Sequence, residues 1–380
     1  MYSYSQISMQ PIFRNTPFRD IGWQISLCFI LAFTLFSCKQ VGTRQLVKVV
    51  DDFPENYSLN SLPTNISTNY YPMMLTVVDT LLLICDTENE PFFHIYNLKN
   101  FEHISSFGEW GHGPSDFADP VFWHQFVIKD STFYIWIFEL NNLTLKKISL
   151  SEAIDNNIPE SIPFSRIQLP AETFTTSSVL VINDSMVVGA GHEARGEFFV
   201  FDIRSEQLSW KPFIMDLPGS IWKQLVSEGL LNEYKLGTMS AKADGSKFIR
   251  TYIYNPIVDV YDSSFERIFS IKTGNPQIPS INRQNKQFDI HTRIFYIGSF
   301  ATNEYIYLLN ANCTLNDYMK GDCSSFILEK FDWKGNPIAK YSLNESVFAT
   351  GSFAIDVSRN RLLTINPDFE HEAIRVFNLQ

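Results

Sequence analysis

Residues 240–262, SAKADGSKFIRTYIYNPIVDVYD, contain the pattern that decides the fold of this chain. A polar turn at Asp244-Gly245-Ser246 leads into the run KFIRTY, and a second apolar and aromatic run ends at Val260-Tyr261-Asp262. Turn residues that separate runs of β-branched and aromatic residues are typical of β-strands. The stretch therefore predicts short strands joined by tight turns.

The same phrase occurs six times along the chain. Its turns are marked by Asp79, Asp130, Asp184, Asp244, Asn303 and Ser358, which are 51, 54, 60, 59 and 55 residues apart. Four further units end a strand as Val260-Tyr261-Asp262 does, at Ile95-Tyr96-Asn97, Val200-Phe201-Asp202, Lys330-Phe331-Asp332 and Val376-Phe377-Asn378. A period near 50 residues indicates a propeller or a solenoid. Six strand-rich units predict an all-β fold: a six-bladed β-propeller with four-stranded blades over residues 44–380.

The sixth unit provides only three strands before the sequence given ends at Gln380. A four-stranded blade then lacks its outer strand, and an exposed sheet edge is a hazard for a soluble protein. We predict that an N-terminal strand at residues 45–51 (QLVKVVD) fills this position and closes the ring.

Composition excludes some classes of function. The chain has 380 residues, of which 45% are hydrophobic and 15% aromatic, so it can bury a large core. Its formal net charge is −11, and binding to nucleic acid needs a clustered basic surface. We therefore expect no nucleic-acid partner.

The N-terminus resembles an export signal. Residues 25–36 (ISLCFILAFTLF) form an apolar run behind Arg14 and Arg19, too short to span a bilayer. The run ends in Leu35-Phe36-Ser37-Cys38, which resembles a bacterial lipobox. We predict a signal peptide over residues 1–37, with either Met1 or Met9 as the start.

Cys38 then becomes the lipidated N-terminus, followed by a short tether through residue 43. The alternative is a cleaved signal of a soluble exported protein, in which Cys38 is incidental. The residues after the cysteine are Lys39-Gln40-Val41-Gly42, without Asp or Glu. We take this as favouring a lipoprotein on the periplasmic side of the outer membrane over one on the cell surface.

Two cysteines flank a polar loop, residues 314–322. Because an exported protein meets an oxidising compartment, a disulfide between Cys313 and Cys323 is expected. The alternative is a pair of free thiols, since pairing depends on a Cα separation that the sequence does not give.

Residues 107–117 read Phe-Gly-Glu-Trp-Gly-His-Gly-Pro-Ser-Asp-Phe. This resembles the FG-x-x-G-x-GP-x-[DE]-F signature of TolB-like six-bladed propeller lipoproteins of Gram-negative bacteria, and more distantly the NHL-repeat propellers. The resemblance implies the fold and an envelope location, and it implies no particular activity.

The residues of the signature themselves suggest a structural role, with ligand binding as the alternative. Its glycines permit positive φ and its proline fixes φ, so the segment can cross from one blade to the next. Asp116 is expected to cap backbone N–H groups and Phe117 to enter the core. The residues concerned are Gly108, Gly111, Gly113, Pro114, Asp116 and Phe117.

Possible ligand contacts are His192, Glu193 and Arg195, in a glycine-flanked loop, and Tyr254 in an aromatic segment. Arginine binds planar anions through paired hydrogen bonds, so a carboxylate or a sugar is a plausible ligand. The alternatives are a solvated hairpin loop for the first three residues and a core position for Tyr254.

No catalytic motif stands out. The sequence has no Gly-x-Ser-x-Gly elbow and no set of ligands at zinc-site spacing, so we assign no catalytic residue, metal or cofactor. We expect a membrane-anchored envelope propeller that binds or scaffolds a protein or oligosaccharide. The alternative is a propeller enzyme that acts on glycans or peptides through acidic residues at the central funnel.

Overall fold

The computed structural model describes most of residues 46–380. The described residues are 46–64, 66, 71–111, 113, 116–155, 164–191, 195–213, 219–275, 279–282, 287–347, 350–368 and 371–380. Residues 46–380 form one compact unit, distinct from residues 1–45. The predicted signal peptide, Cys38 and the tether therefore lie outside the described residues.

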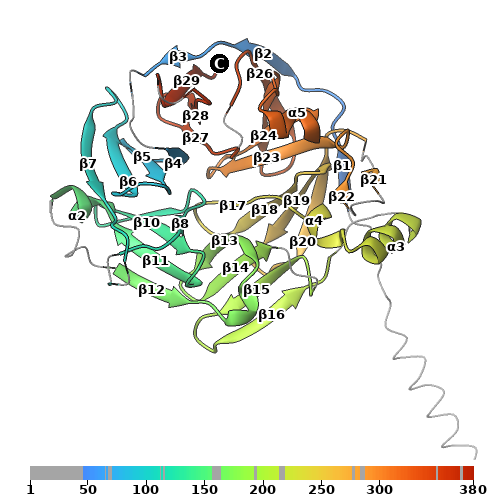
Figure 1. The fold of residues 1–380 in the computed structure, drawn as a ribbon, viewed down its shortest axis with the longest axis horizontal. Helices are drawn as coiled ribbons and strands as arrows, with labels where there is room; N and C mark the ends of the chain where they lie inside the picture. The colour runs from blue at the N-terminus through green and yellow to red at the C-terminus, as the bar shows by residue number, and fades with distance from the viewer. Residues whose placement is uncertain are drawn as a thin grey trace, which may run out of the picture. The chain divides into compact units, whose positions relative to one another are not determined.

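The described unit is a six-bladed β-propeller, as the repeat predicts (Figure 1). From the innermost to the outermost strand, blade one consists of β4 (Pro72–Val78), β5 (Leu81–Asp86), β6 (Phe93–Asn97) and β7 (His103–Phe107). Blade two consists of β8 (Pro120–Val121) and β9 (Phe126–Lys129), which share the inner position, followed by β10 (Thr132–Glu139), β11 (Thr144–Ser149) and β12 (Phe164–Gln168). Blade three consists of β13 (Thr176–Asn183), β14 (Met186–Gly191), β15 (Phe198–Asp202) and β16 (Gln207–Lys211).

The other three blades follow the same order. Blade four consists of β17 (Met239–Ala241), β18 (Lys247–Tyr252), β19 (Asn255–Asp262) and β20 (Arg267–Lys272). Blade five consists of β23 (Arg293–Ala301), β24 (Tyr305–Thr314), β25 (Phe326–Asp332) and β26 (Pro337–Leu343). Blade six consists of β27 (Phe353–Asp356), β28 (Arg361–Ile365), β29 (Ile374–Asn378) and an N-terminal strand, β3 (Leu62–Pro63).

The first three strands of the chain form a strap along the outer edges of blades four to six (Figure 1). β1 (Leu46–Val49) pairs in parallel with β20, and β2 (Glu55–Leu59) pairs in parallel with β26. β3 then pairs antiparallel with β29. The strap thus adds a fifth strand to two blades before it completes the third.

The ring is closed by an N-terminal strand, but the segment predicted for this role was wrong. Residues 46–49 pair with blade four, and Leu62–Pro63 closes blade six. The error arose because the count of strands in blade six gives no information about blades four and five. The outer edges of blades four and five also pair with the strap, and the strap runs along both edges before it reaches β29.

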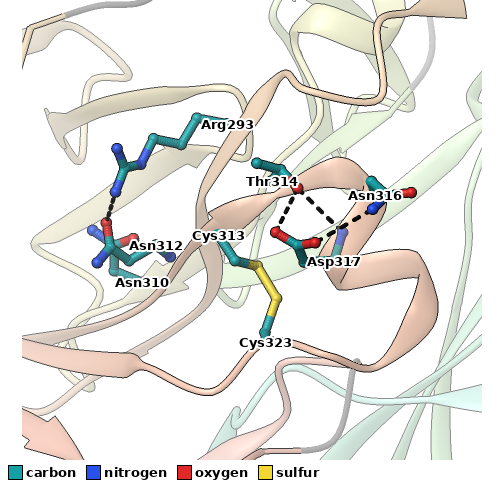
Figure 2. The surroundings of a disulfide bond; sticks show 8 residues. All are labelled: Arg293, Asn310, Asn312, Cys313, Thr314, Asn316, Asp317 and Cys323. Atoms are coloured by element: carbon teal, nitrogen blue, oxygen red, sulfur yellow. Dashed lines mark hydrogen bonds between the residues drawn. A yellow bond between two sulfur atoms is a disulfide. The ribbon is translucent and has the colours of Figure 1, made fainter.

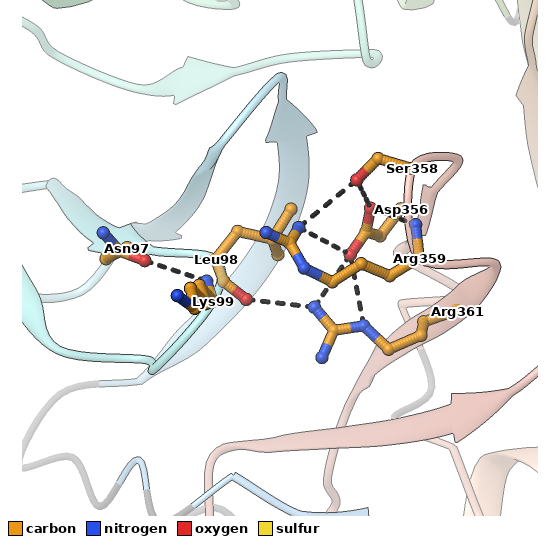
Figure 3. Close-up of polar contacts among 7 residues, drawn as sticks. All are labelled: Asn97, Leu98, Lys99, Asp356, Ser358, Arg359 and Arg361. Atoms are coloured by element: carbon orange, nitrogen blue, oxygen red, sulfur yellow. Dashed lines mark hydrogen bonds and ion pairs between the residues drawn. The ribbon is translucent and has the colours of Figure 1, made fainter.

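A polar contact reinforces the junction between blade six and blade one (Figure 3). Arg361 donates to the Asp356 carboxylate at 2.7 Å and to the Leu98 backbone oxygen of blade one at 3.0 Å. Burial acts to raise the pKa of Asp356, but hydrogen bonds from Ser358, Arg361 and Arg359 outweigh it and hold the pKa below its ordinary value. The ionised carboxylate therefore orients Arg361 toward blade one.

The hydrophobic core is divided among the interfaces between blades. Phe93 stacks on Phe107 and meets Phe117 edge-on, with ring centroids 4.8 and 5.1 Å apart, at the interface of blades one and two. Phe198, Phe248 and Tyr261 pack in the same way between blades three and four. The aromatic residues at strand ends thus fill the wedges between sheets.

The centre of the ring is filled where blade two interrupts its inner strand between β8 and β9. The His124 ring lies 5.0 Å from Phe300 of blade five and 6.4 Å from Phe353 of blade six, measured between centroids. Gln125 exchanges hydrogen bonds with the Val181 backbone of blade three, its Nε2 donating at 3.0 Å and its Oε1 accepting at 2.6 Å. Side chains from blades two, five and six and the backbone of blade three therefore meet near the axis.

Candidate functional site

The strand directions place most of the irregular structure on one face of the ring. Apart from the strap strands β1 and β2, neighbouring strands in each blade are antiparallel. The connection from the second to the third strand therefore emerges on the same side as the connection from one blade to the next. We call this side the connection face. It carries α3 (Gly219–Glu228), α4 (Leu231–Tyr234), α5 (Leu315–Lys320) and the hairpin of β21 (Ile281–Asn282) and β22 (Gln287–Phe288).

The helical pattern at residues 221–234 forms two helices rather than one. Gly229, with φ +73°, follows α3, and α4 begins two residues later. Ile221 and Leu225 of α3 and Tyr234 of α4 pack with Phe288 of the β21–β22 hairpin in a small satellite core. These insertions are therefore packed onto the connection face above blades four and five.

Tyr254 belongs to this satellite core. Its side chain is 6% exposed, and its ring meets Phe288 edge-on with centroids 4.6 Å apart. Burial raises its pKa to about 12. The ring is thus occupied by packing, as in the core alternative, and is not presented to a ligand at the rim.

Of the three loop residues proposed as ligand contacts, only Arg195 lies among the described residues, where it is exposed in a turn. His192 and Glu193 lie outside the described residues. The sequence prediction of a carboxylate or sugar site in this loop therefore stays a prediction.

The Gly-rich segment adopts a compact turn on the connection face between blades one and two. Gly108 has φ +89°, and a Cβ there would lie 2.9 Å from the Phe93 ring. The Gly113 N–H donates to the Asp116 carboxylate at 2.7 Å, and Phe117 is 1% exposed. The segment is thus held by a cap and a buried ring, while Pro114 lies outside the described residues.

The cap is linked to a buried ion pair in blade two. Lys146 pairs with Glu139, donates to the Asp116 backbone oxygen and lies over the Phe117 ring. Glu139 also accepts from the Ala118 N–H at 3.2 Å. Blade two thereby fixes the segment that leads into it.

Cys313 and Cys323 are joined in a disulfide, with their Cα atoms 5.9 Å apart (Figure 2). Most of the loop that they close is helix α5, although the sequence analysis treated it as polar loop. Thr314 caps the helix by accepting from the Asp317 N–H at 3.2 Å, and Gly321 ends it with φ +74°. This pair of caps was the sequence signal for the helix.

Removing this disulfide is expected to lower the free energy of unfolding by about 2–3 kcal/mol, because it closes a loop of about ten residues. The change is the double replacement Cys313→Ala and Cys323→Ala, followed by guanidinium unfolding. Reductant should reproduce the loss in the unaltered chain and leave the double variant unchanged. Equal stability of the oxidised and fully reduced chain would contradict the expectation.

Large apolar side chains are exposed at intervals around the connection face. One lies in each of five connections between blades, and a sixth lies on α5; they are Tyr71, Trp110, Phe174, Val226, Ile290 and Met319. Trp110, Phe174 and Met319 are 60%, 70% and 75% exposed. The opposite face presents Val357 in the β27–β28 turn. Among the described residues, the exposed aromatic side chains Tyr71, Trp110 and Phe174 all lie on the connection face.

A buried polar cluster lies at the interface of blades three and four, beneath the same face. The Tyr252 hydroxyl donates to Asp259 at 2.8 Å and also contacts Glu197. Arg267 pairs with Asp259 at 3.2 Å. Burial raises the pKa of Asp259, against the opposing effect of Arg267. No sequence pattern predicts this cluster, because Glu197 is far from the other members in the chain and joins them only in the folded structure.

No arrangement of three or more His, Cys, Asp or Glu side chains suited to a metal occurs among the described residues. The described helices also include none that is long and apolar enough to cross a membrane. At the ring centre, the His124 ring has the aromatic rings of Phe122, Phe300 and Phe353 among its neighbours.

Comparison with known proteins agrees with this architecture. Residues 52–206 match the family model described as TolB-like 6-blade propeller-like. A Bacteroides fragilis protein described as exported is 13% identical, with a TM-score of 0.50 over 87% of this chain and 98% of that chain. A member of the DUF4221 family from Bacteroides vulgatus is 11% identical, with a TM-score of 0.55 over 85% and 96%. At these identities the likeness shows the fold alone, and no curated protein matches the chain.

Proposed function

We propose that this chain, a six-bladed β-propeller of the TolB-like type, is an envelope lipoprotein that binds a partner protein through its connection face. The observation that supports the proposal is the set of exposed apolar side chains on that face, one on each of six separate connections. Aromatic residues and methionine are enriched at protein interfaces, where a few buried anchors supply most of the affinity.

A protein suits this arrangement better than a small molecule does. The exposed side chains belong to connections from five different blade junctions, so only an extended surface contacts several of them together. The ring centre, by contrast, is packed with His124 and its aromatic neighbours. This filled centre also argues against an enzyme that acts through acidic residues at a central funnel.

The envelope location rests on the sequence and on relatives. The lipobox-like Leu35-Phe36-Ser37-Cys38 predicts a lipid anchor in the outer membrane, on the periplasmic side. The disulfide between Cys313 and Cys323 fits an oxidising compartment. The similarly folded Bacteroides fragilis protein is described as exported.

The test is quantitative capture of envelope proteins with the purified chain and two variants, Trp110→Ala and Phe174→Ala. Loss of an anchoring aromatic residue is expected to weaken binding of the captured partner by about tenfold or more. Val357→Ala, on the opposite face and 65% exposed, is the matched control and should bind as the unaltered chain does.

Equal capture by all three variants would contradict the role of the connection face. Binding to purified envelope oligosaccharide, with no captured protein, would instead favour the glycan partner that the sequence also allows. Radiolabelled palmitate incorporation, abolished by Cys38→Ala, tests the anchor separately.

A further inference from the structure

The outer edge of blade four carries a group of exposed apolar side chains. Leu46, Val47 and Val49 of β1 are 58%, 49% and 61% exposed. Ile268, on the neighbouring strand β20, is 40% exposed. Val47 pairs with Ser270, two residues after Ile268, and side chains alternate along a strand, so Val47, Val49 and Ile268 lie on one face of this edge. We call Leu46, Val47, Val49 and Ile268 the edge patch.

β1 is also an open sheet edge. It is the last strand in the order β1-β20-β19-β18-β17, and no described strand pairs with its other side. Soluble proteins often block such edges with an outward lysine or a proline. The lysine of β1 is turned inward instead, because the Lys48 Nζ lies 5.0 Å from the centre of the Phe269 ring and donates to the Lys334 backbone oxygen. An apolar open edge of this kind is expected to be covered by another surface.

The position of the edge patch in the chain indicates which surface covers it. Only residues 39–45 separate Leu46 from Cys38, the residue proposed to carry the lipid. An extended chain advances at most about 3.5 Å per residue, so Leu46 stays within about 28 Å of the anchored residue. The intervening stretch contains Lys39 and Arg44 but no Asp or Glu, so it carries no charge that an acidic phospholipid surface repels. The anchor thus keeps the edge patch close to the membrane.

The direction of β1 places the anchored end of the chain away from the connection face. β19 ends at Asp262 and β20 begins at Arg267, so the turn between this third and fourth strand lies on the opposite face. β1 runs parallel to β20, and its first residue, Leu46, therefore lies toward the opposite face. After β1 the strap continues with the exposed acidic residues Asp51 and Asp52, where the apolar stretch ends. A membrane that covers the edge patch leaves the connection face accessible.

We propose that the edge patch rests on the phospholipid surface of the membrane that holds the anchor. Its four side chains enter the boundary between headgroups and acyl chains, where binding strength grows with the apolar area buried. Because the tether keeps the patch at a high local concentration near the membrane, a small patch is sufficient. The inference rests on the lipid anchor proposed at Cys38, and it does not depend on the identity of a protein partner.

The test attaches the lipid chemically. The mature chain, residues 38–380, contains the whole compact unit and is coupled through Cys38 to a maleimide lipid in vesicles of phosphatidylethanolamine and phosphatidylglycerol. Cys85 is buried, and Cys313 is joined to Cys323, so Cys38 is the thiol that reacts. The vesicles contain radiolabelled phospholipid, which reports any contact with a photo-cross-linking side chain.

The photo-cross-linking residue benzoylphenylalanine replaces Val47 in one sample and Phe174 in another. Phe174 lies on the connection face and is 70% exposed, so it is the matched exposed position. We expect about tenfold more cross-linking to phospholipid from position 47 than from position 174. Equal cross-linking from the two positions would overturn the proposal. Cross-linking of position 47 to a second copy of the chain, without lipid, would also overturn it and would indicate pairing between open edges.

A second pair of variants tests the apolar character of the edge patch. With the cross-linking residue at Ile268, the double replacement Leu46→Asp and Val49→Asp should reduce lipid cross-linking by about tenfold, because charged side chains are unfavourable in the apolar boundary. Met319→Asp, at a position on the connection face that is 75% exposed, is the control and should leave the yield unchanged. An unchanged yield in the double variant would overturn the proposal. Because the lipid is attached chemically, this result is independent of lipidation in the cell, which the palmitate experiment measures.

Discussion

Replacing Phe53 with alanine is expected to lower the free energy of unfolding by about 3–5 kcal/mol, the usual cost of deleting a buried aromatic ring. Phe53 lies in the strap between β1 and β2 and is 7% exposed. Its ring meets Phe331 of blade five edge-on at 5.2 Å, and it shares a core cluster with Phe269 of blade four. Loss of the ring therefore opens a cavity between two blades and loosens the strap on both.

The control is Val47→Ala in the same strap. Val47 is 49% exposed, so its truncation should change stability by less than about 0.5 kcal/mol. Guanidinium unfolding of both variants gives the comparison. If Phe53→Ala were no more destabilising than Val47→Ala, the strap would not contribute to the core.

Lowering the pH from about 6.5 to about 4 is expected to destabilise the propeller through His124. Burial lowers the pKa of this imidazole from 6.5 to about 4 in the folded state. Above pH 6.5 His124 is neutral in both the folded and the unfolded state, so its contribution to the free energy of unfolding is complete there. As the pH falls, the unfolded state binds the proton first, and up to about 3 kcal/mol is lost by pH 4.

His124→Asn isolates this effect, because asparagine does not titrate and tolerates the positive φ of 56° at this position. The variant should have a flatter dependence of unfolding free energy on pH between 4 and 6.5 than the unaltered chain. His291→Asn, at an exposed position, should keep the original slope. Equal slopes in all three proteins would show that the folded protein does not exclude the proton from His124.

The comparison has to be made between variants, because Glu329 acts in the opposite direction. Burial raises the pKa of this carboxyl group from 4.5 to about 7, against hydrogen bonds from Tyr296 and Asn310. Between these values the folded state holds a proton that the unfolded state has released. The contribution of Glu329 to the free energy of unfolding is therefore complete below pH 4.5 and is lost as the pH rises toward 7. Burial also lowers the pKa of His94 to about 4, in the same direction as for His124, so the stability of the unaltered chain reports a sum of opposed titrations.

The blades could be predicted from the sequence because each is a local pattern. The turn marked by Asp244 and the strand end at Val260-Tyr261-Asp262 recur with a period that only a repeat fold explains, and the resemblance to the TolB-like family is confirmed. The closing strand could not be predicted in the same way. Leu62 pairs with Val376, and nothing near either residue specifies the other.

The candidate site was harder to predict for the same reason. Glu197 and Tyr252 belong to different blades, and their contact depends on how two sheets pack. Tyr254, by contrast, was proposed as a ligand contact for its aromatic surroundings, and those surroundings turned out to be the satellite core.

The strap determines when the protein can finish folding during its synthesis. β3 is among the first parts of the propeller to leave the ribosome, whereas its partner β29 ends at Asn378. The early blades can form from neighbouring strands. The strap strands β1, β2 and β3, however, have no partners until β20, β26 and β29 have been synthesised. Pairing over such long sequence separations is slow, and the open edges invite association with other chains. The ring of this chain therefore stays open until its last strand, β29, has been synthesised.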